Sequence, residues 1–494
     1  MQHNAVSAGV SFSNILTTKR VRTSASNDGP KLKRADSSGG SVSKKRKNLI
    51  RADASSSSLD RYSIWRRNLP ILYDAIIYHG CASLSCTFAK RPARVEEFSV
   101  KRLVYYSTRT TATYSTATKT WDKDGKPGML YVGELDTPSV NSSRRKFISR
   151  FIEGNRSSRV SVLKTIIHPG EVNRIRTSSR HESLIATHTD SEIVFLWDVD
   201  KQEDRDMGGK QNEGKSTLAN VPTLALTGHK AKAEFALEFS RSSDHLLSGG
   251  SDNLVCLWDL ADYGSSSGSA PSNGYENTLE AAHVFEGHTA PVEGCCFHPT
   301  DGGSTCASVG DDKRALFWDT RVGNQPVVQM DDIHEDDINC CSWNPHDERY
   351  FVTGSSDNNI CLFDLRQTGT SEKPTVLKKL NCHNSPVLNV QWSPHNGQYL
   401  AVSGEENLVT IYDLGPEPLS DIGSSSYPLA FFKHAGHKTP VVDFDWNTEE
   451  PFSFLTVSDD NHSDDAVTGG CMQFWRVTEF LTRASDPDFV EELE

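Results

Sequence analysis

The spacing between a histidine and a later aromatic residue recurs along this chain and limits the folds it can adopt. The clearest copy covers residues 287–321. Gly287-His288 opens it, a turn at Gly310-Asp311-Asp312 follows, and Phe317-Trp318-Asp319 ends it about thirty residues after the histidine. The same spacing, longer only in the last copy, is found in six pairs: His168 with Trp197, His229 with Trp258, His288 with Trp318, His334 with Phe363, His383 with Tyr412, and His437 with Trp475.

Each copy also carries an acidic residue in its turn, which gives the histidine a partner. These acids are Asp190, Asp252, Asp311, Asp357, Glu405 and Asp459. A unit with this pattern is typical of a WD repeat, which folds as one four-stranded antiparallel blade of a β-propeller. We expect each histidine to hydrogen-bond its turn carboxylate and the closing aromatic residue to pack between strands. The histidines are therefore interpreted as structural residues, neither catalytic nor metal-binding.

Six repeats are one blade fewer than a seven-bladed ring needs. The segment before them supplies candidate strands at residues 83–88, 101–107 and 129–134. Pairing of the first and last strands within one blade would remove the exposed edges of an open sheet. The sequence thus predicts an all-β, seven-bladed WD40 propeller over residues 81–478.

The segments outside the repeats have different compositions. Residues 60–80 carry apolar residues near helical spacing and predict a helix that starts at Asp60, with Pro70 expected to kink or interrupt it. Residues 479–494 form an acidic tail. No run of eighteen apolar residues is present, so no membrane span is expected, and the first thirty residues do not resemble a secretion signal.

Charge is divided unequally between the ends of the chain and its body. Residues 1–60 hold eleven Lys or Arg against four Asp, whereas the whole chain has a net charge of −13. Residues 1–59 are also rich in serine and are expected to be disordered. Two basic clusters predict a nuclear import signal, made of Lys31, Lys33, Arg34, Lys44, Lys45, Arg46 and Lys47. A simple solvated tail or weak contact with DNA phosphates are the alternatives.

One apparent phosphate-binding motif is interpreted as a loop. Gly209 and Gly214-Lys215-Ser216 match the spacing of a phosphate loop. That chemistry needs a strand before the loop and a helix directly after it, and no helix fits before Pro222. We therefore expect neither nucleotide binding nor any other cofactor, and no enzymatic activity.

Several segments resemble a known family more closely than a generic WD protein. These are WRRNLPILYD, HPGEVNRIR, ATHTDSEIVFLWDVD and HAGHKTPVVDFDWN. They resemble the retinoblastoma-binding, chromatin-assembly small-subunit family of histone-binding WD-repeat proteins, and are most similar to its plant MSI-type (FVE) branch. Members are shared subunits of chromatin assembly, histone deacetylase and Polycomb complexes. The resemblance therefore implies a nuclear histone-binding scaffold.

The resemblance also implies two binding sites. A groove for the first helix of histone H-four would be formed by Leu72, Ile76, Phe432 and Leu481, with acids from Glu417 and Asp421. A site for a basic tail of histone H-three or a corepressor would lie on the top face and use Glu171, Asn173, Arg174, Phe235, Glu293, Asn339 and Asp459.

A further motif favours a different function. Trp318, Asp319 and Arg321 fit a Trp-Asp-x-Arg box that resembles those of substrate receptors docking on cullin-RING ubiquitin ligase adaptors. Residues 363–366 are a weaker copy. A ligase substrate receptor is therefore the alternative function, although an arginine two residues after a repeat-closing Trp-Asp pair also arises without any such role.

Overall fold

The computed structural model describes residues 61–81, 83–96, 99–110, 112–115, 118–122, 126–138, 160–205, 217–261, 263, 275–368, 376–380, 383–415, 429–459 and 470–482. The chain divides into two units, residues 1–68 and 69–494. Residues 61–72 are helical. No helix in the described ranges is long and apolar enough to cross a membrane.

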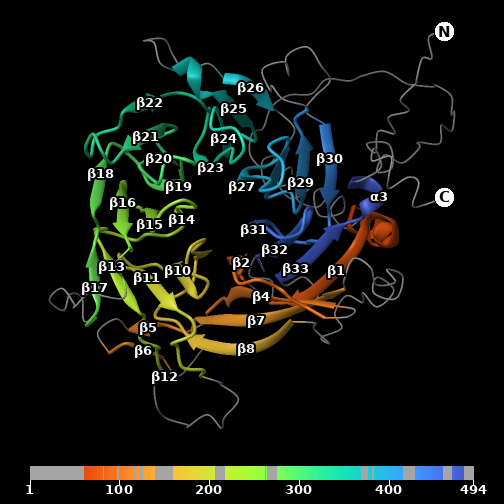
Figure 1. Cartoon of the computed structure of the whole chain (residues 1–494), viewed down its shortest axis with the longest axis horizontal. Coiled ribbons are helices and arrows are strands. Elements are labelled where there is room, and N and C mark those ends of the chain that lie inside the picture. Colours follow the sequence, from red (N-terminus) through yellow and green to blue (C-terminus); the bar gives the residue numbers. More distant parts are fainter. Residues whose placement is uncertain are drawn as a thin grey trace, which may run out of the picture. The chain divides into compact units, whose positions relative to one another are not determined.

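The second unit is a seven-bladed β-propeller (Figure 1). Blade 1 contains β2 (Cys86–Phe88), β4 (Ser99–Thr108), β7 (Met129–Pro138) and β8 (Val160–Ile167), with β3 (Arg94–Val95) beside β4. Blade 2 contains β9 (Arg174–Thr177), β10 (Leu184–His188), β11 (Val194–Asp198) and β13 (Leu224–Thr227), and β17 (Thr278–Glu280) adds a parallel strand. Blade 3 contains β14 (Leu237–Phe239), β15 (His245–Gly249), β16 (Leu254–Asp259) and β18 (His283–Glu286).

The remaining blades repeat this order. Blade 4 contains β19 (Val292–Phe297), β20 (Thr305–Gly310), β21 (Ala315–Asp319) and β22 (Val328–Met330), and blade 5 contains β23 (Ile338–Trp343), β24 (Tyr350–Ser355), β25 (Ile360–Asp364) and β26 (Val376–Leu380). Blade 6 contains β27 (Val387–Trp392), β28 (Tyr399–Gly404), β29 (Val409–Asp413) and β30 (Leu429–His434). Blade 7 contains β31 (Val441–Trp446), β32 (Ser453–Ser458), β33 (Cys471–Val477) and β1 (Tyr73–Gly80).

A few short elements lie outside the blades. The strands β5 (Tyr114–Ser115), β6 (Thr120–Trp121) and β12 (Thr217–Leu218) form a small separate sheet, η2 (Leu365–Thr368) follows β25, and α3 (Glu479–Thr482) follows β33.

The burial pattern of each strand follows its position in the blade. Middle strands such as β10, β11 and β24 are buried at every residue. Neighbouring blades cover both of their faces, so even polar residues such as Thr353 and Ser355 are buried. Inner strands such as β23 and β27 instead contain both buried and half-buried residues. The core is thus a series of layers between blades, for example Phe317, Trp343 and Phe351 between blades 4 and 5.

Closure of the ring corrects one expectation. The helix predicted over residues 60–80 ends at residue 72, two residues after Pro70, and Tyr73–Gly80 forms β1. This strand pairs antiparallel with β33, with Ile76 opposite Trp475. The open edge of β33 offers β1 a complete set of backbone partners, and this pairing outweighs the helical spacing of its apolar residues. The prediction that first and last strands share one blade is confirmed.

The expected histidine–carboxylate bond forms in blades 3 to 6. His229 Nδ1 donates to Asp252 at 3.1 Å, His288 to Asp312 at 2.9 Å, His334 to Asp357 at 3.1 Å and His383 to Glu406 at 2.6 Å. In blade 4 the relay continues, because Ser308 Oγ donates to His288 Nε2 at 2.8 Å and accepts from Trp318 Nε1 at 2.8 Å. Such a closed set of buried hydrogen bonds confirms a structural role for these histidines.

The acidic partners differ from the prediction in four repeats. In blades 4 and 6 the partner is one residue later than expected, Asp312 for Asp311 and Glu406 for Glu405. The peptide N–H of the earlier residue in each turn is instead bound to a neighbouring carbonyl, that of Pro291 or Pro386, so the next side chain reaches the histidine.

The other two differences are in blades 2 and 7, where no carboxylate of the described residues bonds the histidine. His168 Nδ1 donates to the Gly170 carbonyl at 3.1 Å, and His437 Nδ1 lies 3.4 Å from Cys471 Sγ. Burial lowers the pKa of both imidazoles to about 3, so both are neutral. Asp190 and Asp459, the predicted partners, accept from Asn173 and Arg109.

Candidate functional site: a charged central channel

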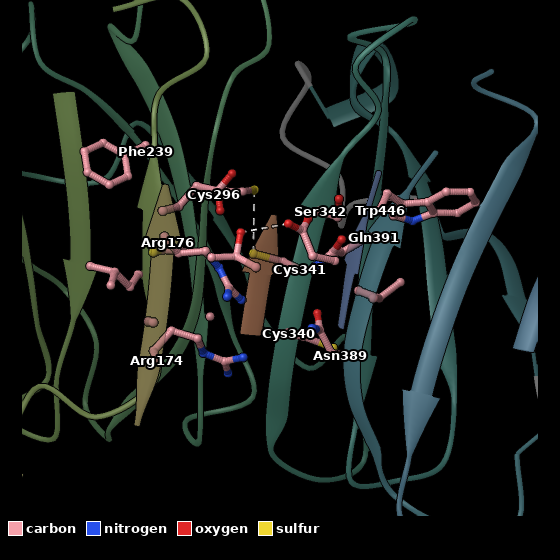
Figure 2. Close-up of a pocket in the computed structure, with 18 of the residues that line it drawn as sticks. Arg174, Arg176, Phe239, Cys296, Cys340, Cys341, Ser342, Asn389, Gln391 and Trp446 are labelled. Carbon is pink, nitrogen blue, oxygen red and sulfur yellow. Dashed lines mark hydrogen bonds between the residues drawn. The ribbon is translucent and has the colours of Figure 1, made fainter. Parts of the chain in front are cut away.

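The inner strands of the blades surround a channel with a cavity of about 150 Å³. Inner strands point alternate side chains toward the axis, so the residues that face this cavity come from distant parts of the sequence. Figure 2 shows Arg174 and Arg176 from β9, Cys341 and Ser342 from β23, and Asn389 and Gln391 from β27 around it.

A buried ion cluster joins three blades across the channel. Asp443 on β31 is completely buried; its carboxylate accepts from Arg174 at 2.9 Å, from Arg176 at 3.0 Å and from Asn389 Nδ2 at 3.0 Å. Ser85 Oγ donates to the same carboxylate. Burial alone would raise the pKa of Asp443, but the two arginines hold it below its usual value. Asp443 is thus ionised, and its negative charge is compensated by Arg174 and Arg176.

This cluster assigns Arg174 a role that differs from the predicted peptide contact. Its Nη1 is bound to Asp443, and its Nε donates to the Phe235 carbonyl at 3.0 Å. Burial lowers the pKa of Arg174, although Asp443 opposes that effect. Asp443 was not among the residues predicted from the sequence. The available signal was an acid flanked by apolar residues in an inner strand, matched by two arginines at alternate positions in another.

A group of carboxylates lies together where blades 3, 4 and 5 meet, and we call it the acidic rim: Glu234, Glu293, Asp311 and Asp337. All four are half-buried. Desolvation first, and then Asp311 and Glu234, raise the pKa of Glu293 to about 7; Arg174 opposes this and Asp337 adds to it. Desolvation and the neighbouring Asp337 likewise raise the pKa of Asp311. Burial is the larger cause of both shifts, and the neighbouring carboxylates add to it.

Of the other predicted top-face residues, Glu171 and Asp459 lie near Arg109. Glu171, from a separate acidic group, has its pKa raised by desolvation, with Thr110 N–H and Arg109 opposing and Asp190 and Asp459 adding to the rise. Asp459 is paired with Arg109 at 2.9 Å.

Two amides are already engaged within the protein. Asn173 Nδ2 donates to Asp190 at 2.7 Å, and Asn339 Nδ2 donates to the Val387 carbonyl at 2.7 Å. Phe235, in contrast, is 37% exposed and is free to stack on a bound chain.

The predicted histone groove is only partly available. Phe432 is buried; its ring stacks on that of Trp475 and lies edge-on to that of Tyr73. Ile76 is buried within β1. These two side chains therefore belong to the core of the propeller and cannot line a groove, which corrects that expectation. Leu72 and Leu481 are half-buried, and the neighbouring Ile71, not predicted, is 65% exposed.

Asp74 follows Leu72 closely in the chain and links this segment to the start of α3, which carries Leu481. Its carboxylate accepts from Thr478 Oγ1 at 3.1 Å and from the Glu479 N–H at 3.0 Å, which caps α3. The Thr478 N–H donates to the Leu72 carbonyl. The carboxylates predicted for this groove, Glu417 and Asp421, lie outside the described residues.

The Trp-Asp-x-Arg box has a defined geometry. Arg321 donates to the Asp319 carboxylate through Nε at 2.9 Å and Nη2 at 2.8 Å, and its side chain is 65% exposed. These two hydrogen bonds lower the pKa of Asp319. Trp318 is buried in its blade. Arg366 is bound to Asp364 in the same way. The basic clusters at 31–34 and 44–47 and the phosphate-loop match at 209–216 lie outside the described residues.

Comparison with known proteins agrees with this geometry. A family model described as "WD domain, G-beta repeat" matches residues 220–259, 279–319, 327–364 and 374–413. The strands that end these matched stretches belong to blades 3 to 6, whose histidines are bonded to carboxylates. The chain is also 36% identical over 453 residues to the WD-40 repeat-containing protein MSI4 of Arabidopsis thaliana, with 88% of this chain and 85% of that protein covered.

Proposed function

This chain belongs to the MSI-type family of WD-repeat proteins, and we propose that it is a nuclear, chromatin-associated scaffold that binds histones for partner enzymes. In this role the propeller presents a basic histone segment to deacetylase, Polycomb or chromatin-assembly subunits and performs no chemistry itself. The basic clusters of residues 31–47 would supply nuclear import.

The observation that carries this proposal is the acidic rim. Burial, and then the neighbouring Asp311 and Glu234, disfavour the charged form of Glu293, and a cation placed among these carboxylates would favour it. An arginine is the best fit, because its guanidinium donates two parallel hydrogen bonds to one carboxylate. The amino-terminal tails of histones are basic and extended, so they match the charge of the acidic rim. Phe235 at the same end supplies an aromatic surface.

Calorimetric titration of the full chain with a histone H-three tail peptide tests this proposal. We expect micromolar or tighter binding. Glu293→Gln is expected to weaken it by about tenfold or more, because a charge-assisted hydrogen bond contributes about 1.5–3 kcal/mol. Glu280→Gln, an exposed carboxylate on β17, is the matched control and should bind like the parent chain. Failure of the folded parent chain to bind would overturn the proposal.

A second candidate function is docking on a cullin-RING ligase adaptor, which would make the chain a substrate receptor. The Asp319–Arg321 double hydrogen bond favours it, because it holds an exposed guanidinium in a fixed orientation. Arg321→Ala should then abolish co-purification with the adaptor. Arg366→Ala, at the weaker copy, is the control. Retention of the adaptor by Arg321→Ala would exclude this docking mode.

A further inference from the structure

Two cysteine side chains meet in the wall of the channel, between blades 4 and 5. Cys296 on β19 and Cys341 on β23 have their Sγ atoms 3.7 Å apart, as the dashed line in Figure 2 shows. Both are free thiols and both line the channel cavity. Cys296 is buried, whereas Cys341 is half-buried.

A glycine allows the two strands to come this close. A Cβ atom on Gly294 would lie 3.0 Å from the Cα of Cys340 and 3.3 Å from the backbone nitrogen of Cys341. Any side chain there would push β23 away. Residues two apart in a strand share a face, so Gly294 and Cys296 both face β23. The close approach of the two backbones at Gly294 therefore brings the two sulfurs into contact.

The adjacent cysteines on the same strands have different surroundings. Cys295 packs with Leu247 and Cys306 in the layer between blades 3 and 4. Cys340 packs with Val352 and Val387 between blades 5 and 6, and its thiol donates to the Gly354 carbonyl. Each adjacent pair thus contributes one sulfur to the contact and one to a separate apolar layer.

We infer that Cys296 and Cys341 form an oxidisable dithiol, which hydrogen peroxide converts into a disulfide that joins blades 4 and 5. The sulfur of Cys341, the more exposed of the two, attacks one peroxide oxygen. The O–O bond breaks, and a sulfenic acid and one water form. The sulfur of Cys296 then displaces the hydroxyl group, which leaves as a second water, and the S–S bond forms. The two thiols lose two electrons, and peroxide gains them.

The geometry favours the second step over further oxidation. Bond formation requires the sulfurs to close by roughly 1.7 Å, and the resolving sulfur is already in contact. The hydrogen bond that the Cys341 thiol donates to Cys296, together with burial, keeps the pKa of Cys341 well above its usual value. The thiolate is therefore scarce at neutral pH, and oxidation is slow and becomes faster as the pH rises.

Peptide mapping of the native full chain tests this inference. The reduced protein is treated with a small excess of hydrogen peroxide, blocked with N-ethylmaleimide, digested and analysed by mass spectrometry. We expect one cross-linked peptide pair, 295/296 with 340/341, that has lost two hydrogens. The melting temperature should rise by about 5 °C and fall again with dithiothreitol, because a cross-link that closes a long loop restricts the unfolded chain.

Serine variants assign the sulfurs within each adjacent pair. Cys295→Ser and Cys340→Ser should still form the cross-link. Cys296→Ser should lose it and instead collect sulfinic acid at Cys341. A link that survives in Cys296→Ser, or consumption of both thiols without a link in the parent chain, would overturn the inference. The parent chain alone decides the second outcome, so a variant that misfolds does not prevent the test.

Discussion

Glu293 is the residue whose ionisation most directly affects the proposed binding. Its pKa of about 7 lies well above that of an ordinary carboxyl group, so near neutral pH only about half of the molecules carry the charge. A cationic peptide selects the ionised form. Binding should therefore strengthen as the pH rises through 7.

Between pH 6 and pH 8 we expect the dissociation constant of an amino-terminally acetylated histone H-three tail peptide to fall by about tenfold, as the ionised fraction rises. Titration calorimetry across this range measures it, and the acetyl group removes the peptide's own amino titration. Glu293→Gln should show a flat profile. A parent-chain profile that is equally flat would assign the binding to other carboxylates.

Asp443 is expected to matter for stability because it compensates two buried arginines. Asp443→Asn removes the charge and leaves Arg174 and Arg176 facing each other in the channel wall. Breaking a buried ion cluster in this way costs about 3–5 kcal/mol, which denaturant unfolding can measure. Asp259→Asn, at an exposed position at the end of β16, is a control that should change little. A stable Asp443→Asn protein would show that water solvates the two arginines.

At the scale of elements, β1 decides whether the ring is closed. Ile76 is buried opposite Trp475, so truncation should leave a cavity. We expect Ile76→Ala to lower the free energy of unfolding by about 2–5 kcal/mol and Ile76→Val by about 0.5–1.5 kcal/mol. If Ile76 faced a solvent-exposed groove instead, both values measured by denaturant unfolding would be close to zero.

Also at the scale of elements, Ile71, Leu72 and Leu481 form a surface that remains a proposed site for an amphipathic helix. Leu72→Asp should leave the fold intact, because this side chain is only half-buried, and should weaken binding of a peptide of the first helix of histone H-four by at least tenfold. Leu163→Asp, also a partly exposed leucine but on β8, is the matched control. Equal effects of the two substitutions in a binding titration would argue against this surface.

At the scale of the whole molecule, charge separation governs association with basic partners. The chain has a net charge of −13, although residues 1–60 are strongly basic, so residues 61–494 carry the acidic excess. We expect binding of a basic histone peptide to weaken by about tenfold or more between 50 mM and 500 mM salt, because screening acts on exposed and half-buried charges. Titration of the chain and of residues 61–494 at both concentrations checks this. A salt-independent affinity would point to apolar contacts instead.

Much of the fold was predictable from particular residues. The recurrent histidine-to-aromatic spacing placed six repeats correctly, because each of these blades buries a histidine before its inner strand and an aromatic residue in its third strand. The partner acids were less certain, as Asp312 and Glu406 show, because two adjacent acids in a turn cannot be distinguished without the direction of their side chains. In the site, the carboxylates Glu293 and Asp311 were visible in the sequence, but their mutual repulsion was not. Asp443 was missed because its arginine partners are over 260 residues away.

The sequence by itself determined what depends on local periodicity: blades, turns, the number of repeats and the division of charge. Only the tertiary structure decided what depends on closure of the ring. It turned Tyr73–Gly80 from a predicted helix into a strand, because the free edge of β33 supplies hydrogen-bond partners that no local pattern records. It also placed Ile76 and Phe432 in the core, joined Asp443 to Arg174 and Arg176, and brought Cys296 to Cys341. Each of these contacts joins segments that come together only when the blades pack against one another around one axis.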